Sequence, residues 1–134
     1  MNIPGLRLSA AADTVPWRDT ASPGVRWLLL ASEDRPGVAK ERLGATVLIQ
    51  MDPGRGYPPH RHDDVEEVLV LAGGYRDERG EHRAGDYIRY EPGSVHAPIA
   101  LGDPARPVSE DNPACVLFAT ARGGISRVTD TPQP

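Results

Sequence analysis

Glycine and proline interrupt this chain every few residues, and they limit its fold more than any other feature. The 134 residues include fourteen glycines and fourteen prolines. Proline removes a backbone donor and breaks helices, and glycine favours turns, so long helices are not expected. Frequent glycine and proline residues favour short strands joined by turns. The sequence therefore predicts an all-β fold.

Five segments between the turn signals have the β-branched and apolar composition of strands. Turn residues such as Asp52-Pro53-Gly54 and Gly73-Gly74 separate these segments. A tight hairpin is expected over residues 75–83, with an exposed His82 close to its tip. The five predicted strands cover residues 25–31, 45–51, 67–71, 86–90 and 114–121.

The length of the chain is that of a single domain. We expect an N-terminal arm over residues 1–16, one domain over 17–122 and a C-terminal tail over 123–134. The single cysteine, Cys115, cannot form an internal disulfide, and its apolar neighbours predict a buried thiol.

Charge and hydropathy argue against two classes of partner. The net charge is −4, and the basic residues form no stripe, so we expect no nucleic-acid partner. Apolar runs such as residues 27–31 are far shorter than a membrane span or a signal segment. We therefore expect a cytoplasmic protein with no membrane partner.

Residue types that bind transition metals gather between residues 54 and 96. His60 and His62 are two apart, so on a strand both project from the same face. Glu66 shares their parity, which predicts one continuous face carrying two imidazoles and a carboxylate. His96 follows the hairpin and must come from another strand. Neutral imidazoles with one carboxylate suit Fe, Mn, Co, Ni, Cu or Zn rather than Ca or Mg.

Parity along the strand also predicts which neighbouring side chains face the metal. Glu67 should point away from the metal, whereas Val68, Val70 and Ile88 are expected to line the site. A His-x-His pair or a Glu-Glu pair alone is more often a solvated feature, so only the joint spacing supports a metal site. Proton competition for the imidazoles predicts that metal affinity falls as the pH drops through about 6.5.

The joint spacing resembles the two motifs of the cupin superfamily. Residues 54–73 fit the first motif, G-x5-H-x-H-x3-E-x6-G, at every defined position. Residues 85–96 resemble the second motif, G-x5-P-x-G-x2-H, except that Glu91 stands where the motif has proline. Ala100 also replaces the asparagine expected after that motif. These departures concern the turn and the surroundings of the site rather than the four ligands.

The stretch E-E-V-L-V-L-A-G-G-Y-R-D-E-R-G, residues 66–80, is similar to the ChrR-like branch of cupins. That branch is named for the C-terminal sensing domain of an anti-sigma factor, and it also includes dioxygenase-like proteins. The resemblance covers roughly residues 17–122. It implies a cupin (RmlC-like jelly-roll) β-barrel, also described as a double-stranded β-helix.

The resemblance also implies a cofactor and a partner. One divalent transition metal per chain is expected, with Fe(II) or Zn first and Ni or Mn as further choices. The ligands would be His60, His62, Glu66 and His96. Small cupins resemble one another in pairing through barrel edges, so we expect a homodimer in which residues 25–31 supply part of the surface.

Two functions remain open at this point. In an enzyme of the dioxygenase type, four ligands on octahedral Fe(II) leave two positions for a small oxygenated substrate and O₂. In a ChrR-like sensor without catalytic activity, the same ligands complete a tetrahedral Zn site. Sugar-nucleotide epimerisation, known in other cupins, needs no such metal set. Because the sequence shows no Cys-x-x-Cys and no helical sigma-binding segment, we favour the enzyme.

Overall fold

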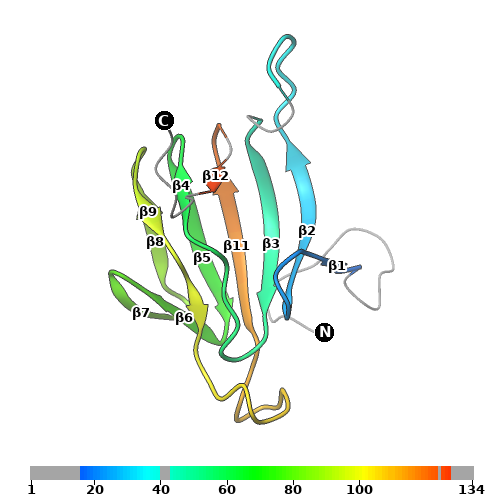
Figure 1. Ribbon diagram of the computed structural model, residues 1–134, viewed down its shortest axis with the longest axis vertical. Coiled ribbons are helices and arrows are strands. Elements are labelled where there is room, and N and C mark those ends of the chain that lie inside the picture. Colours follow the sequence, from blue (N-terminus) through cyan, green and yellow to red (C-terminus); the bar gives the residue numbers. More distant parts are fainter. Residues whose placement is uncertain (1–15, 40–42, 124, 128–134) are drawn as a thin grey trace, which may run out of the picture.

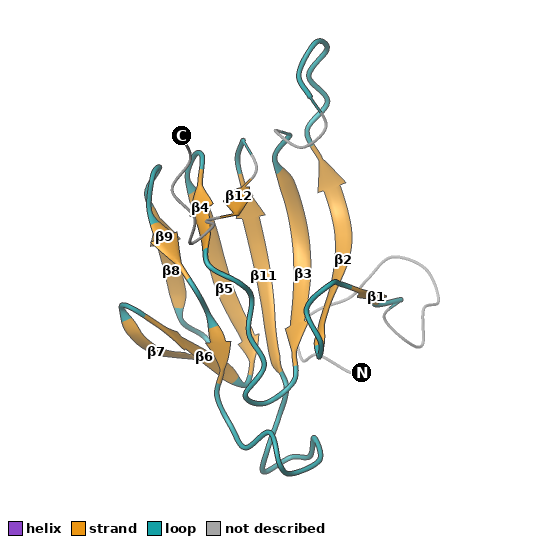
Figure 2. Ribbon diagram, viewed as in Figure 1, coloured by secondary structure: helices purple, strands orange, loops and turns teal. Residues whose placement is uncertain are grey.

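Strands and loops account for all of the described structure, which is a computed structural model covering residues 16–39, 43–123 and 125–127 (Figure 2). In this part of the chain, no helix has the length and apolarity needed to cross a membrane. The strands are β1 (Arg18–Asp19), β2 (Val25–Ser32), β3 (Ala45–Met51), β4 (His60–His62), β5 (Glu66–Ala72), β6 (Gly74–Asp77), β7 (Gly80–Arg83), β8 (Tyr87–Tyr90), β9 (Val95–His96), β10 (Ile99–Ala100), β11 (Cys115–Ala121) and β12 (Ile125–Arg127). The predicted all-β fold is confirmed.

The strands form one large antiparallel sheet and two small ones (Figure 1). The large sheet has the order β1-β2-β3-β11-β5-β8, so the late strand β11 inserts between two early strands. The small sheets have the orders β10-β6-β7 and β12-β4-β9. Side chains from the large sheet and from both small sheets line one common cavity, so the small sheets face the large one. This is the layered arrangement of a jelly roll.

Alternation along the strands decides which side chains enter the interior. On β5, Glu66, Val68 and Val70 are buried, whereas Leu69 between them is 39% exposed. Neighbouring side chains on a strand point to opposite faces, and this explains the pattern. The buried core combines such inward residues from both layers, including Tyr75 and Leu117.

Gly73 shows why the first motif ends in glycine. It joins β5 to β6 with a φ of 62°, which L side chains rarely adopt. A Cβ at this position would lie 2.5 Å from the Ala114 carbonyl oxygen. The sharp passage from the large sheet to a small one therefore requires a residue without a side chain.

All five predicted strands and the hairpin are confirmed, with ends that differ by at most one residue. The continuous face predicted from His60 through Glu66 is wrong. β4 ends at His62, the chain bends at residues 63–65, and β5 begins at Glu66 in a different sheet. The Asp64 carboxylate accepts a 2.7 Å hydrogen bond from the Val65 amide in this bend. Such local bonds compete with continued strand pairing.

The predicted arm and tail fall largely outside the described residues. Residues 1–15, 124 and 128–134 are not described. Within the predicted tail, Ile125–Arg127 forms β12, which pairs antiparallel with β4. This pairing places a strand from the end of the chain beside the two histidines of the first motif.

Candidate metal centre

Three short segments bring the four predicted ligands together. His60 and His62 lie on β4, Glu66 is the first residue of β5, and His96 lies on β9. β4 and β9 are antiparallel, with His60 directly opposite His96. One ligand atom from each of the four residues lies within 4.8 Å of the others, and all four residues are buried. The Glu66 side chain joins them from the opposite sheet.

The hydrogen bonds of the three imidazoles give them the same tautomer. His60 Nδ1 lies 3.0 Å from the Pro58 carbonyl oxygen, which can only accept. His62 Nδ1 lies 3.3 Å from Ser94 Oγ, whose own proton is donated to the Glu91 carbonyl. His96 Nδ1 lies 3.0 Å from a carboxylate oxygen, that of Asp77. Each Nδ1 therefore donates, which leaves each Nε2 with a lone pair for a metal.

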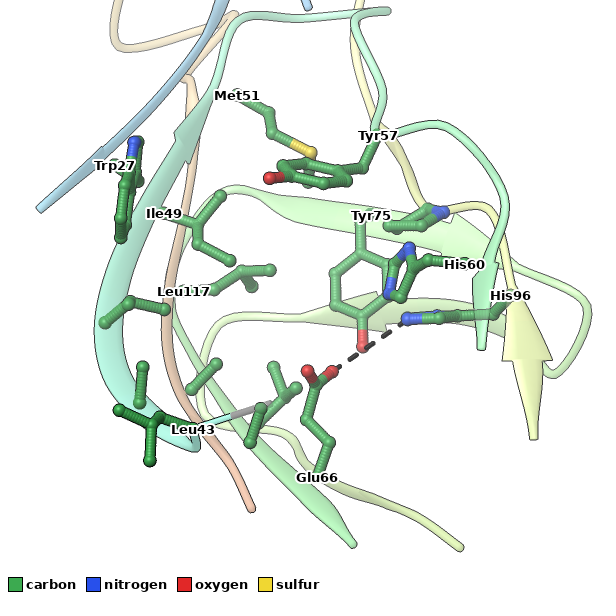
Figure 3. A pocket seen from close by; sticks show the side chains of 16 residues that line it. Trp27, Leu43, Ile49, Met51, Tyr57, His60, Glu66, Tyr75, His96 and Leu117 are labelled. Carbon is green, nitrogen blue, oxygen red and sulfur yellow. Dashed lines mark ion pairs between the residues drawn. The ribbon is translucent and has the colours of Figure 1, made fainter. Parts of the chain in front are cut away.

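The Nε2 atoms of His62 and His96 are buried, and they make no hydrogen bond within the described residues. Glu66 Oε1 lies 3.3 Å from His62 Nε2 and 3.9 Å from His96 Nε2. Figure 3 shows the Glu66 and His96 side chains pointing toward each other. Unpaired buried polar atoms are costly, and a cation between them would satisfy all of them. The cluster is consistent with one metal site.

Burial keeps the imidazoles neutral. It lowers the pKa of His62 to about 3 and that of His96 to about 4, and it also lowers the pKa of His60. The neighbouring imidazoles add to the effect at His62. Burial acts in the opposite direction on the carboxylic acid and raises the pKa of Glu66 to about 7. Before metal binding, Glu66 is therefore the group that takes up a proton near neutral pH.

Metal affinity should consequently fall below pH 7 because of Glu66 rather than the histidines. A carboxyl group with a pKa of about 7 must lose its proton to bind, so affinity should drop roughly tenfold per pH unit below 7. Chelator competition with Zn²⁺ between pH 8 and 5.5 measures this slope. In a Glu66→Gln variant, the slope should disappear over the same range. A steep slope retained in that variant would assign the proton to the imidazoles, as first predicted from the sequence.

The prediction of which neighbouring side chains face the site is confirmed only in part. The Glu67 side chain is 37% exposed and lies 3.8 Å from Arg89, away from the cluster. Val68 lines the cavity beside the cluster, whereas Val70 and Ile88 are buried in the core and do not line it. Cys115 is buried as predicted, and burial raises its pKa to about 12.

Asp77, at the end of β6, is a buried group that the sequence did not single out. Its side chain has no exposed surface. Oδ2 accepts hydrogen bonds from Tyr90 at 2.5 Å and from His96 at 3.0 Å. Oδ1 accepts from the Arg79 amide and from His82 Nε2, both at 3.0 Å. Burial alone would raise the pKa of Asp77, but these bonds outweigh it and lower the pKa to about 2.

His82 is therefore not the exposed hairpin residue that the sequence predicted. Its side chain is only 12% exposed and packs against the Tyr75 ring, with ring centroids 4.8 Å apart. His82 is the cross-strand partner of the buried Tyr75, so its side chain lies on the inward face of the hairpin. Neither Asp77 nor His82 carries a sequence signal, because a polar residue beside a turn is ordinarily solvated.

Two tyrosines connect this carboxylate to the interior. The Tyr75 hydroxyl lies 2.6 Å from the Tyr90 hydroxyl, and Tyr90 donates to Asp77. Tyr75 therefore donates to Tyr90. Burial raises the pKa of both phenols, so both stay protonated. The chain of bonds holds the Tyr90 ring against His96, with ring centroids 4.2 Å apart, and the Tyr75 side chain at the cavity wall.

A cavity of about 280 Å³ lies next to the cluster, between the two layers. His60, Glu66 and His96 line it, so three of the four candidate ligands are reached from this space. Apolar side chains of β3 and β11 form much of the remaining wall, among them Ile49 and Leu117 (Figure 3). A small molecule in this cavity would therefore contact a metal bound by the cluster.

The profile of one protein family, described as ChrR Cupin-like domain, matches residues 7–105, which is most of the chain. The chain belongs to the ChrR cupin-like family. A comparison with curated proteins finds no match to this cupin.

Solved structures agree with the family and the fold. The anti-sigma factor ChrR of Rhodobacter sphaeroides, in complex with SigE, is 27% identical over 83% of this chain, with a TM-score of 0.61. This cupin spans only 50% of that ChrR chain. An RmlC-like cupin from Ralstonia eutropha has a TM-score of 0.65 at 18% identity, covering 88% of this chain and 69% of its own. An acetylacetone dioxygenase from Acinetobacter johnsonii has a TM-score of 0.64 at 17% identity; the match covers 97% of this chain and 86% of the dioxygenase chain. The last two share the fold alone.

Proposed function

We propose that this cupin binds one divalent transition metal through His60, His62, Glu66 and His96 and uses it as a dioxygenase-type enzyme on a small oxygenated substrate. The observation that carries the proposal is the cavity, which reaches three of these residues. A metal that only supports the fold needs no such access. A metal that acts on a substrate needs an open side.

In this proposal, the residues of the chain have separate roles in binding the metal and in shielding the reacting groups. Three Nε2 atoms and the Glu66 carboxylate hold the ion, and the Nδ1 hydrogen bonds keep the imidazoles in place. The metal supplies positive charge that polarises a substrate oxygen and, as iron(II), reactivity toward O₂. The apolar walls exclude water from the reacting groups. In a dioxygenase both oxygen atoms enter the products, so the substrate supplies the electrons and no separate reductant is required.

A second function, a ChrR-like zinc sensor without catalytic activity, is favoured by a different observation. The structure with 27% identity is an anti-sigma factor, and the family profile carries its name. Three imidazoles and a carboxylate are enough to fill a tetrahedral Zn²⁺ site. In this case the cavity would remain without a substrate.

Metal analysis combined with oxygen uptake separates the two functions. The full chain, purified without a nickel column, should contain about one iron per chain and should consume O₂ with a small dicarbonyl compound; acetylacetone is a suitable first test. A His62→Ala variant, which loses a ligand, is the matched control and should show neither property. Zinc at one per chain, with no oxygen uptake after iron reconstitution, would support the sensor. Absence of any stoichiometric metal would contradict both.

A further inference from the structure

We infer that the cavity takes a small, largely apolar molecule whose metal-binding oxygen atoms lie at one end and which carries no second ionised group. The inference rests on the proposed metal centre, because the oxygen end would meet the metal. It goes further than that proposal by stating the shape, charge and polarity of the ligand. These three properties follow from the volume of the cavity and from where charged and apolar side chains lie in its wall.

The side chains that can hold a metal ion or carry a charge lie together at one end of the cavity, whereas Trp27 and Tyr57 add single N–H and O–H groups to a wall that is otherwise apolar. Figure 3 shows His60, His96, Glu66 and Tyr75 on one side of it, with Ile49 on the facing wall. The Tyr75 hydroxyl is already engaged by Tyr90, and each of the two imidazoles uses its Nδ1 for a bond outside the cavity. A ligand therefore finds oxygen-binding capacity at the metal and a largely apolar surface beyond it.

The described part of the cavity wall offers no partner for a second ionised group on the ligand. Among the described residues that line the cavity, none is lysine or arginine, and Glu66 is the single acid. A carboxylate or phosphate on the far end would be buried without a partner, which is strongly unfavourable. Sugar phosphates, nucleotide sugars and dicarboxylates do not fit this wall. Apolar groups, by contrast, gain from contact with side chains such as Leu117 and Val47.

The volume sets the size of the ligand. A cavity of roughly 150 Å³ accommodates benzene in an apolar protein interior. The present cavity, at about 280 Å³, is nearly twice as large. It therefore has space for a single ring with a short oxygen-bearing substituent, or for a branched aliphatic chain of similar bulk.

Hydroxamates test the inference because one metal-binding group can carry different tails. The full chain is loaded with Co²⁺, and its visible spectrum is followed during titration with three probes. These are benzohydroxamate, acetohydroxamate and para-carboxybenzohydroxamate. Benzohydroxamate should bind at least tenfold more tightly than acetohydroxamate, since its ring contacts the apolar wall. The carboxylated probe should bind at least tenfold more weakly than benzohydroxamate, because its second charge has no partner.

The outcomes separate this inference from the proposed function. Equal affinities for benzohydroxamate and either of the other probes would overturn the inference while leaving the metal centre intact. A protein that takes up no Co²⁺, with no metal-dependent spectrum, would overturn the metal centre itself. The expected order of affinities, measured by a spectral change and not by turnover, supports both.

Two variants test whether the ring of benzohydroxamate binds in the cavity. Ile49→Trp should fill part of the space and weaken benzohydroxamate at least tenfold, with little effect on acetohydroxamate. Thr46→Trp is the matched control, because Thr46 lies on the same strand but does not line the cavity. The Co²⁺ spectrum before titration verifies that each variant still forms the site. An unchanged affinity in Ile49→Trp would show that the ring binds elsewhere and would overturn the inference.

Discussion

Replacing His62 with alanine should abolish tight metal binding. His62 is fully buried, its Nε2 faces Glu66, and the described residues offer that atom no hydrogen bond. Four-ligand zinc sites gain about 10–16 kcal/mol from the metal, so one ligand accounts for about 3 kcal/mol or more. This corresponds to an affinity loss of more than about 100-fold. Competition titration with a chelating dye measures the loss, and a circular dichroism spectrum verifies that the variant is folded.

Two adjacent carboxylates provide the matched comparison. Glu66→Gln should weaken binding, because a neutral amide oxygen is a poorer ligand than a carboxylate. Glu67→Gln should leave the affinity nearly unchanged, since the Glu67 side chain points toward Arg89 and solvent. If Glu67 were the sensitive position and Glu66 the silent one, the orientation of β5 described above would be wrong. If His62→Ala bound metal as well as the unchanged protein, the cluster would not be the metal site.

Asp77→Asn should weaken metal binding without removing a ligand. Its two oxygens accept four hydrogen bonds, and asparagine has one acceptor oxygen and an NH₂ that faces donors. His96 would lose the partner that holds its ring and its tautomer, which typically costs about 10–100-fold in metal affinity. The donors left unpaired should also lower the free energy of unfolding by about 2–5 kcal/mol. Chelator competition well below the melting temperature measures the first effect, and thermal unfolding measures the second.

Glu81→Gln is the control for Asp77, because Glu81 lies in the same hairpin but is exposed and contacts only Arg83 among the ion pairs described. It should change neither quantity measurably. A Co²⁺ spectrum adds a readout that a purely structural role of Asp77 would not move. If Asp77→Asn lowered stability but left both the spectrum and the affinity unchanged, Asp77 would support the hairpin and not His96.

The sequence by itself indicated the strands and named the four candidate donors that the structure brings together. Gly and Pro mark the turns, and a period of two on a strand requires His60 and His62 to share a face. The turn positions and the shared face of His60 and His62 depend only on local geometry, so the tertiary structure does not change them. The spacing to His96 indicated a second strand, and the two-motif pattern indicated the family. The burial of Cys115 followed in the same way from its apolar neighbours.

Only the tertiary structure decided how Glu66, Asp77 and the cavity enter the site. Glu66 reaches the imidazoles from the large sheet and not along a continuous strand, because the chain bends at residues 63–65. Asp77 and His82 look like solvated turn residues in the sequence, but in the structure Asp77 bonds to His96 and His82 packs against Tyr75. The cavity exists because β3 and β11, far apart in sequence, lie side by side and face β4. Contacts between distant segments depend on how the layers pack, and local residue patterns carry no information about that packing.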